Sequence, residues 1–89
     1  MTATQARTRK RLVALFTDGT DFECSPNNPR LLQAFQAEFG KTAPGGDNVI
    51  RETCWLAWHA NGRPEDLEAY IDRIDSIDIE EIPAPKATS

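Results

Sequence analysis

The sequence predicts an α+β domain in which one N-terminal β-hairpin packs on three helices, with a short C-terminal segment as a candidate third strand. Three observations lead to this prediction. Two strand-like runs flank an Asp-Gly dipeptide at positions 18–19, and three segments carry apolar residues at helical spacing. Within residues 76–82, isoleucine alternates with acidic residues at 77–80. A chain of 89 residues has room for one small core.

The composition is that of a globular protein. Hydrophobic residues make up 39% of the chain and charged residues 27%, and no segment approaches the roughly 20 apolar residues of a membrane span. The start is polar and basic without the apolar run of a secretory signal, which predicts a cytoplasmic location. Residues 1–10 and the tail at 83–89 are expected to be disordered, which leaves residues 11–82 as a single domain.

Charge is unevenly distributed along the chain, whose formal net charge is −4. The basic residues near the start are Arg7, Arg9, Lys10 and Arg11, whereas residues 65–81 hold eight carboxylates against one arginine. An acidic surface repels phosphate backbones, which argues against nucleic acid as the main partner. The simpler interpretation of the two runs is a frayed basic terminus and a solubilising acidic face.

The hairpin is predicted from the runs on either side of the Asp-Gly dipeptide at 18–19, because both residues tolerate the positive φ of a type I′ turn. A two-residue loop there places Leu15 opposite Phe22. The apolar face in this register consists of Val13, Leu15, Phe22 and Cys24. Because a lone hairpin is marginally stable in water, a helix is expected to cover that face.

The first helix is predicted between Asn28 and Gly40. Asn28 suits the N-cap, Pro29 suits the first helical position, and Gly40 suits the residue that ends a helix. Its buried stripe is predicted to contain Leu31, Leu32, Phe35 and Phe39. The following segment, residues 41–46, contains a proline and two glycines and is expected to be an irregular connection.

The central helix is predicted from Asp47, as N-cap, to Gly62, as the left-handed residue at its end. This segment is rich in apolar residues and holds both tryptophans. Its apolar residues cover more than one face, which is typical of a core helix or of one that carries a binding surface. The narrow polar side is predicted to contain Arg51, Glu52, His59 and Asn61.

The third helix is predicted to begin with Pro64 at its first position. Its apolar face is predicted to contain Leu67, Tyr70, Ile71 and Ile74. Beyond it the pattern changes to alternation, with Ile77 and Ile79 on one side. The sequence is compatible with two structures for this short segment, a third strand added to the hairpin or an unpaired extended edge.

Catalysis has little support in the sequence, so the chain is predicted not to be an enzyme. His59 is the single histidine and no nucleophile motif accompanies it. Cys24 and Cys54 form no CxxC pair, so reduced thiols and no metal site are expected. The DGTD segment lacks the further ligands of a calcium loop, and no cofactor is predicted.

The two tryptophans are the first candidates for a binding surface. Trp55 and Trp58 are neighbours on the helix surface because they lie three residues apart. One is expected in the core. The apolar surface of the helix exceeds what a hairpin and two short helices can cover, so the other is a candidate contact for a client or for a second copy. The residues predicted to bind a partner are Trp55, Trp58, Tyr70, Ile77 and Ile79.

Three stretches carry a family resemblance: LFTDGTDFE, NPRLL and WLAWHANGRPEDLEAY. In this order, within residues 11–82, the chain resembles the small tail assembly chaperones of long-tailed bacteriophages (siphoviruses), particularly those of actinobacterial hosts. The resemblance implies a non-enzymatic protein that binds the apolar tape measure protein, keeps it soluble and helps to recruit tail tube subunits. It also implies action in the cytoplasm of the infected bacterium, absence from the finished virion and a longer form made by frameshifting.

Two other functions are compatible with the sequence. One is a structural virion component, such as a head-tail connector or tail completion protein, which would be present in purified particles. The other is a small regulator that contacts nucleic acid through residues 7–11, which would bind DNA in a salt-sensitive way.

Overall fold

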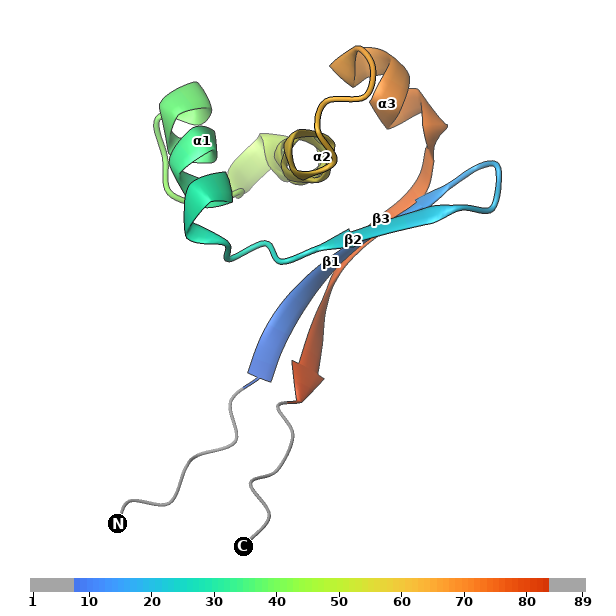
Figure 1. The fold of residues 1–89 in the computed structure, drawn as a ribbon. Coiled ribbons are helices and arrows are strands. Elements are labelled where there is room, and N and C mark those ends of the chain that lie inside the picture. Colours follow the sequence, from blue (N-terminus) through green and yellow to red (C-terminus); the bar gives the residue numbers. More distant parts are fainter. Residues whose placement is uncertain (1–7, 84–89) are drawn as a thin grey trace, which may run out of the picture.

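The computed structural model describes residues 8–83 as a three-stranded antiparallel sheet and three α-helices (Figure 1). The elements in chain order are β1 (Thr8–Phe16), β2 (Asp21–Cys24), α1 (Pro29–Phe39), the 3-10 helix η1 (Gly46–Asn48), α2 (Val49–Ala60), α3 (Leu67–Arg73) and β3 (Ile74–Pro83). β1 is the central strand, with β2 on one side and β3 on the other. The predicted α+β class is confirmed, as are the N-terminal hairpin and the third strand.

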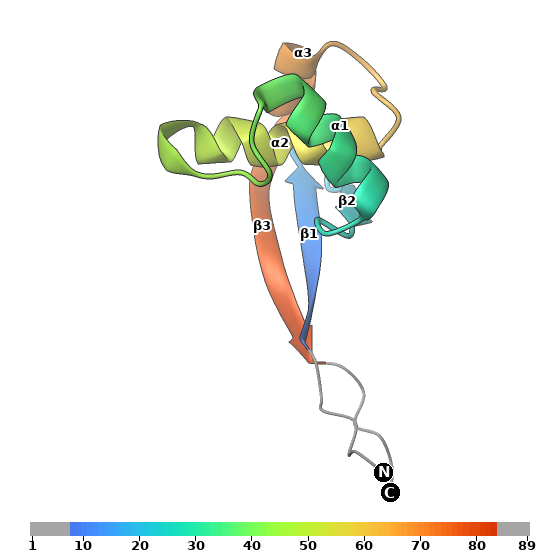
Figure 2. The same cartoon turned by 90° about the vertical axis from the view of Figure 1, so that its left-hand side faces the viewer.

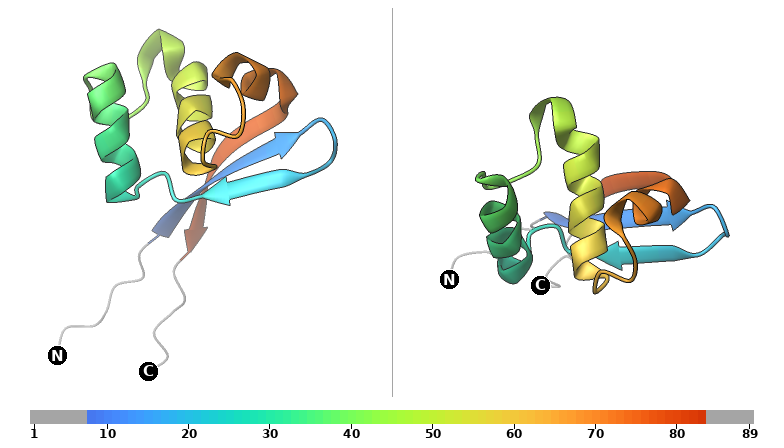
Figure 3. Two further views of the ribbon diagram at one scale, coloured as in Figure 1. Left: turned by 45° about the horizontal axis from the view of Figure 1, so that its top comes forward. Right: turned by 90° about the horizontal axis from the view of Figure 1, so that it is seen from above.

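The helices gather on one face of the sheet and leave the other face open (Figure 3). β1 and β3 continue past the end of β2 as a two-stranded ribbon that projects away from the helices (Figure 2). The core lies between the helices and the three-stranded part of the sheet. This arrangement is usual for an antiparallel sheet with one buried face.

The hairpin forms, but its register differs by one residue from the predicted one. Leu12 pairs with Cys24 and Ala14 with Phe22, so the loop contains three residues, 17–19, instead of two. Gly19 adopts a φ of +91°, and its N–H donates to the carbonyl of Phe16 at 3.0 Å. A turn that ends in a left-handed glycine is a common three-residue hairpin loop.

The shift of one residue turns every β1 side chain to the opposite face. The β1 side chains in the core are Leu12, Ala14 and Phe16. Leu15 is instead 44% exposed on the open face, so the predicted burial of Val13 and Leu15 together is wrong. Phe22 and Cys24 do pack against the core. Because residues 12–16 are all apolar, either register buries apolar side chains, and the strand pattern alone does not choose between them.

β3 pairs with β1 along almost its whole length. Ile77 and Ile79 lie on the same side, opposite two buried residues of β1, as the alternation predicts. A bulge at Asp75 shifts the register near the start of the strand, so that Ile74 also faces the core side.

The basic start of the chain pairs with its acidic end, since residues 8–11 lie opposite residues 80–83. The Arg11 guanidinium donates to Glu80 at 2.7 Å and to Glu23 at 3.3 Å. The Arg11 side chain therefore links β1 to both neighbouring strands through ion pairs.

The strands reach beyond the predicted domain of residues 11–82. β1 begins at Thr8 and β3 ends at Pro83, so the prediction of disorder is wrong for residues 8–10 and for Pro83. The remaining residues of the two predicted disordered ends, 1–7 and 84–89, lie outside the described part of the chain.

α1 has the bounds that the sequence predicts. The side chain of Asn28 accepts hydrogen bonds from the N–H groups of Arg30 at 2.9 Å and Leu31 at 3.2 Å. Gly40 follows the helix in the left-handed region with φ of +73°. Leu31 and Phe35 face the core, as predicted from their spacing.

α2 begins later than predicted but ends as predicted. Asp47 is not the N-cap, because it lies within η1, and α2 starts at Val49. At the other end, Gly62 has a φ of +82°. Its N–H donates to the His59 carbonyl at 3.1 Å, and the N–H of Arg63 donates to the Trp58 carbonyl at 2.9 Å. This pair of bonds is a Schellman motif, which satisfies the last carbonyls of the helix.

Glu52 was predicted on the polar side of α2 but is only 4% exposed. One carboxylate oxygen accepts from the N–H of Gly45 at 3.1 Å, and the other lies 2.8 Å from the Lys41 ammonium group. Glu52 thus fastens the connection between α1 and α2 to the helix. The hydrogen bond from Lys41, aided by the N–H of Gly45, lowers the pKa of the Glu52 carboxyl.

We expect acid to weaken the contacts of the Glu52 carboxylate with Lys41 and Gly45. Because the pKa of Glu52 is lower in the folded than in the unfolded chain, its contribution is present above the ordinary pKa of 4.5 and is lost as the pH falls through the folded-state value. The difference in free energy of unfolding between wild type and Glu52→Gln should therefore shrink from pH 7 to pH 3, as measured by urea denaturation. Glu38→Gln, an exposed site on α1, is the control. An unchanged difference would contradict the prediction.

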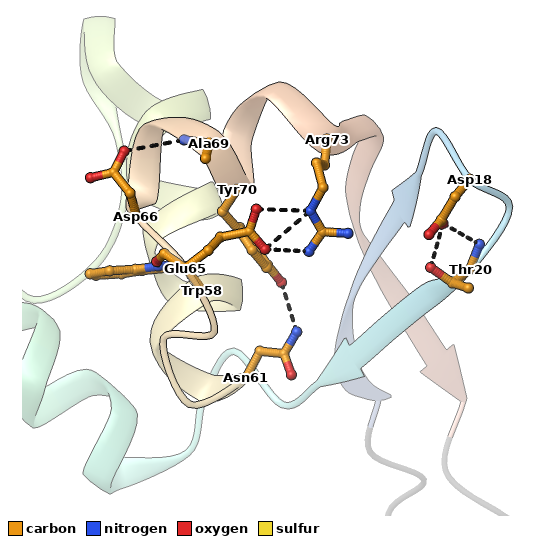
Figure 4. A network of polar contacts seen from close by, with 9 residues as sticks. All are labelled: Asp18, Thr20, Trp58, Asn61, Glu65, Asp66, Ala69, Tyr70 and Arg73. Carbon is orange, nitrogen blue, oxygen red and sulfur yellow. Dashed lines mark hydrogen bonds and ion pairs between the residues drawn. The ribbon is translucent and has the colours of Figure 1, made fainter.

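α3 begins three residues after the predicted start, because Asp66 is its N-cap and Pro64 precedes the helix. The Asp66 carboxylate accepts from the N–H of Glu68 at 3.1 Å. Glu65 precedes the helix and forms an ion pair in which the Arg73 side chain donates to its carboxylate at 2.7–3.1 Å (Figure 4). This pair ties the α2–α3 connection to the end of α3.

Candidate partner-binding surface

Trp55 belongs to the core and not to a binding surface. It is 3% exposed and stands edge-on to Phe35 and Phe39, with ring centroids at 5.9 and 5.4 Å. The His59 ring stacks on it at 4.8 Å. These contacts join α1 to α2.

Trp58 is half-buried and is largely covered by its own chain. Its indole N–H donates to the Glu65 carbonyl at 2.6 Å, and the guanidinium carbon of Arg63 lies 4.7 Å from its ring centroid. The ring lines a shallow cavity of about 240 Å³ together with Arg51 and Arg63. The Trp58 side chain thus secures the α2–α3 connection, and only part of it is accessible.

Tyr70 is fully buried, so its side chain is not part of the exposed surface. Its ring stands edge-on to Phe16 at 5.4 Å. Its hydroxyl accepts a hydrogen bond from the Asn61 amide at 3.2 Å (Figure 4). The spacing of the third helix predicts Tyr70 on the apolar face. Tyr70 is the buried residue of that face, whereas Ile71 and Ile74 are half-buried.

Ile77 lines an open apolar groove, and Ile79 lies two residues further along the same face of β3. Ile77 is half-buried, and Ile79 is 44% exposed. The groove has a volume of about 370 Å³ and lies between α2, α3 and β3. We call it the isoleucine groove; its lining residues are Ile50, Cys54, Ile71, Ile74, Asp75, Ser76 and Ile77.

Ile50 is the main surface residue that sequence reasoning did not assign to a site. It is 65% exposed, and its neighbour Val49 is 38% exposed. Figure 2 shows the first turn of α2 reaching out past β3, where the sheet provides nothing to cover it. The excess of apolar surface on the helix was the available signal. The uncovered apolar residues lie at the start of the helix and not at the tryptophans.

A second cavity, of about 290 Å³, contains Cys24 and His59 among its lining residues. Burial raises the pKa of the Cys24 thiol to about 11, so the thiol is protonated at neutral pH and is a poor nucleophile. Burial and the nearby Arg63 lower the pKa of His59. Both cysteines are free thiols.

Within residues 8–83, no group of at least three histidine, cysteine or carboxylate side chains is placed to hold a metal ion. No described helix has the length and apolar character needed to cross a bilayer.

Comparison of the chain with protein-family models, with curated proteins and with solved structures gave no match.

Proposed function

We propose that this chain is a tail assembly chaperone of a long-tailed phage and that it binds apolar segments of the tape measure protein in the isoleucine groove. The observation that carries the proposal is the open groove of about 370 Å³, which continues onto the 65% exposed side chain of Ile50. The sequence stretches that resemble phage chaperones support the identity of the client.

The chemistry of the groove suits a chaperone. Contiguous exposed apolar surface on a small domain is typical of an interaction site, because leaving it in water is unfavourable. The chain carries a net charge of −4, which helps to keep a complex with an apolar client in solution. The protein would act in the host cytoplasm before tail assembly is complete.

We expect the substitution Ile50→Asp to abolish client binding without unfolding the chain. The side chain is mostly exposed, so its loss costs little stability, while a carboxylate in an apolar interface must be desolvated without a partner. Co-expression with the tape measure protein of the same genome measures the effect. Wild type should co-purify with soluble client, and the variant should retain less than about one tenth as much, which corresponds to roughly 1.4 kcal/mol.

Leu15→Asp is the matched control, because Leu15 is also exposed but lies on the open face of the sheet, away from the groove. It should retain the client. Equal loss in both variants would argue for general misfolding, and absence of any wild-type complex would overturn the proposal. Stoichiometric amounts of the chain in purified virions, detected by mass spectrometry, would favour a structural virion role instead.

A further inference from the structure

The outer edge of β3 is open to a further strand. β3 lies at the border of the sheet and contains 10 residues, whereas β2 at the opposite border contains four. Within residues 8–83, the only backbone partner of β3 is β1, on its inner side. The backbone groups along the outer side are therefore available over roughly 30 Å of strand.

The two faces of this edge differ in chemistry. Ile77 and Ile79 lie on the helix side, and Ile77 lines the isoleucine groove. Asp78 and Glu80 lie on the open side, because alternate residues of a strand point to opposite faces. A strand laid along residues 77–80 would therefore meet isoleucine side chains with one half of its residues and carboxylates with the other half. Beyond this stretch, Glu81 lies on the helix side and Ser76 on the open side.

The negative charge of β3 determines which kind of strand can pair with its outer edge. β3 carries the carboxylates Asp75, Asp78, Glu80 and Glu81 and no basic residue. Two copies paired edge to edge would bring these like charges together, which is destabilising across strands. A partner strand with lysine or arginine on its open side would instead form opposite-charge pairs, so a basic client fits where a second copy does not.

We propose that the outer edge of β3 accepts an extended client segment in which apolar residues alternate with lysine or arginine. The segment adds a fourth strand to the sheet, and its apolar side chains lie beside Ile77 and Ile79. Its basic side chains lie over Asp78 and over Glu80, which also accepts from Arg11. Backbone hydrogen bonds supply affinity and the alternating side chains supply selectivity. This inference rests on the proposed chaperone function, because it specifies the client sequence that the groove takes.

The first test uses a capped eight-residue peptide of alternating valine and lysine with the full-length protein, and measures affinity by fluorescence anisotropy. N-methylation removes backbone donors, and successive N–H groups of a strand point in opposite directions. N-methylating every valine in one peptide and every lysine in another should give two different results, with at least a tenfold loss of affinity for one and little change for the other. Equal effects of the two modifications would overturn strand addition.

The second test reverses the charge of the edge. Asp78→Lys should weaken binding of the valine-lysine peptide at least tenfold and favour a valine-glutamate peptide. Asp21→Lys makes the same change on exposed β2, at the opposite border of the sheet, and should leave affinity nearly unchanged. If both variants weaken peptide binding equally, the loss of affinity comes from the change in net charge, and the assignment of the binding site to β3 is wrong. A wild-type dimer in sedimentation that excludes the peptide would identify a second copy as the occupant and overturn it as well.

Failure of this inference can be distinguished from failure of the proposed function. If the tape measure complex forms and is lost in Ile50→Asp but is unaffected by Asp78→Lys, strand addition is wrong and the chaperone function stands. If the peptide binds with the expected dependence on backbone methylation and edge charge but the tape measure protein does not, the edge site stands and the client is a different basic, apolar segment.

Discussion

Replacing Trp55 with alanine should remove most of the stability of this protein. The indole is 3% exposed and touches aromatic rings of α1 and α2, so its loss creates a large cavity where two helices meet. Substitutions of buried aromatic residues by alanine cost about 3–5 kcal/mol. A small domain has a stability near the lower end of roughly 5–15 kcal/mol, because it buries a smaller fraction of its surface. Urea denaturation followed by circular dichroism measures the change.

Trp58→Ala is the matched substitution on the same helix. Its indole is half-buried and its main polar contact is the bond to the Glu65 carbonyl at 2.6 Å. We expect a loss of roughly 1–3 kcal/mol, with the native fold retained. Equal losses for the two variants would show that Trp58 contributes to the core as much as Trp55, contrary to the structure.

Leu12→Ala should destabilise the protein by about 2–5 kcal/mol, while Leu15→Ala should change stability by about 0.5 kcal/mol or less. The two leucines lie on the same strand and undergo the same chemical change. Leu12 is fully buried under the helices, whereas Leu15 is 44% exposed on the open face. The free energies of unfolding of both variants, measured under the same conditions, provide the comparison.

This pair of variants also tests the register of the hairpin. A two-residue loop would place Leu15 on the covered face and Leu12 on the open one, so it predicts the opposite order of effects. A larger loss for Leu15→Ala would therefore contradict the three-residue loop. Near-equal losses would mean that both faces of β1 are covered, which the open face of the sheet contradicts.

The ends of the helices show where sequence signals are reliable. Asn28 and Gly40 bound α1 as predicted, because a cap hydrogen bond involves groups only two to four residues apart. The starts of α2 and α3 were placed too early, because several plausible caps follow one another. The chain first forms a 3-10 turn at Asp47, and Asp66, two residues after Pro64, caps α3.

The candidate site was predicted only in part. The alternation of β3 correctly placed Ile77 and Ile79 together on one side of the strand. The sequence does not distinguish a buried tyrosine from an exposed one. In the structure, the Tyr70 ring packs against the ring of Phe16 in the core. Ile50 is exposed because the start of α2 extends beyond β3. The spacing of apolar residues in the sequence does not indicate how far the helix extends past the sheet.

The sequence by itself determined the α+β class, the hairpin, the bounds of α1 and the end of α2, since these features depend on residues close together in the chain. Only the tertiary structure decided the hairpin register, the burial of Glu52, and which apolar residues stay exposed. These outcomes depend on competition among all surfaces that the core can bury. Residues 12–16 fit two registers equally well until the helices are in place, and the isoleucine groove exists because the helices leave the β3 border uncovered.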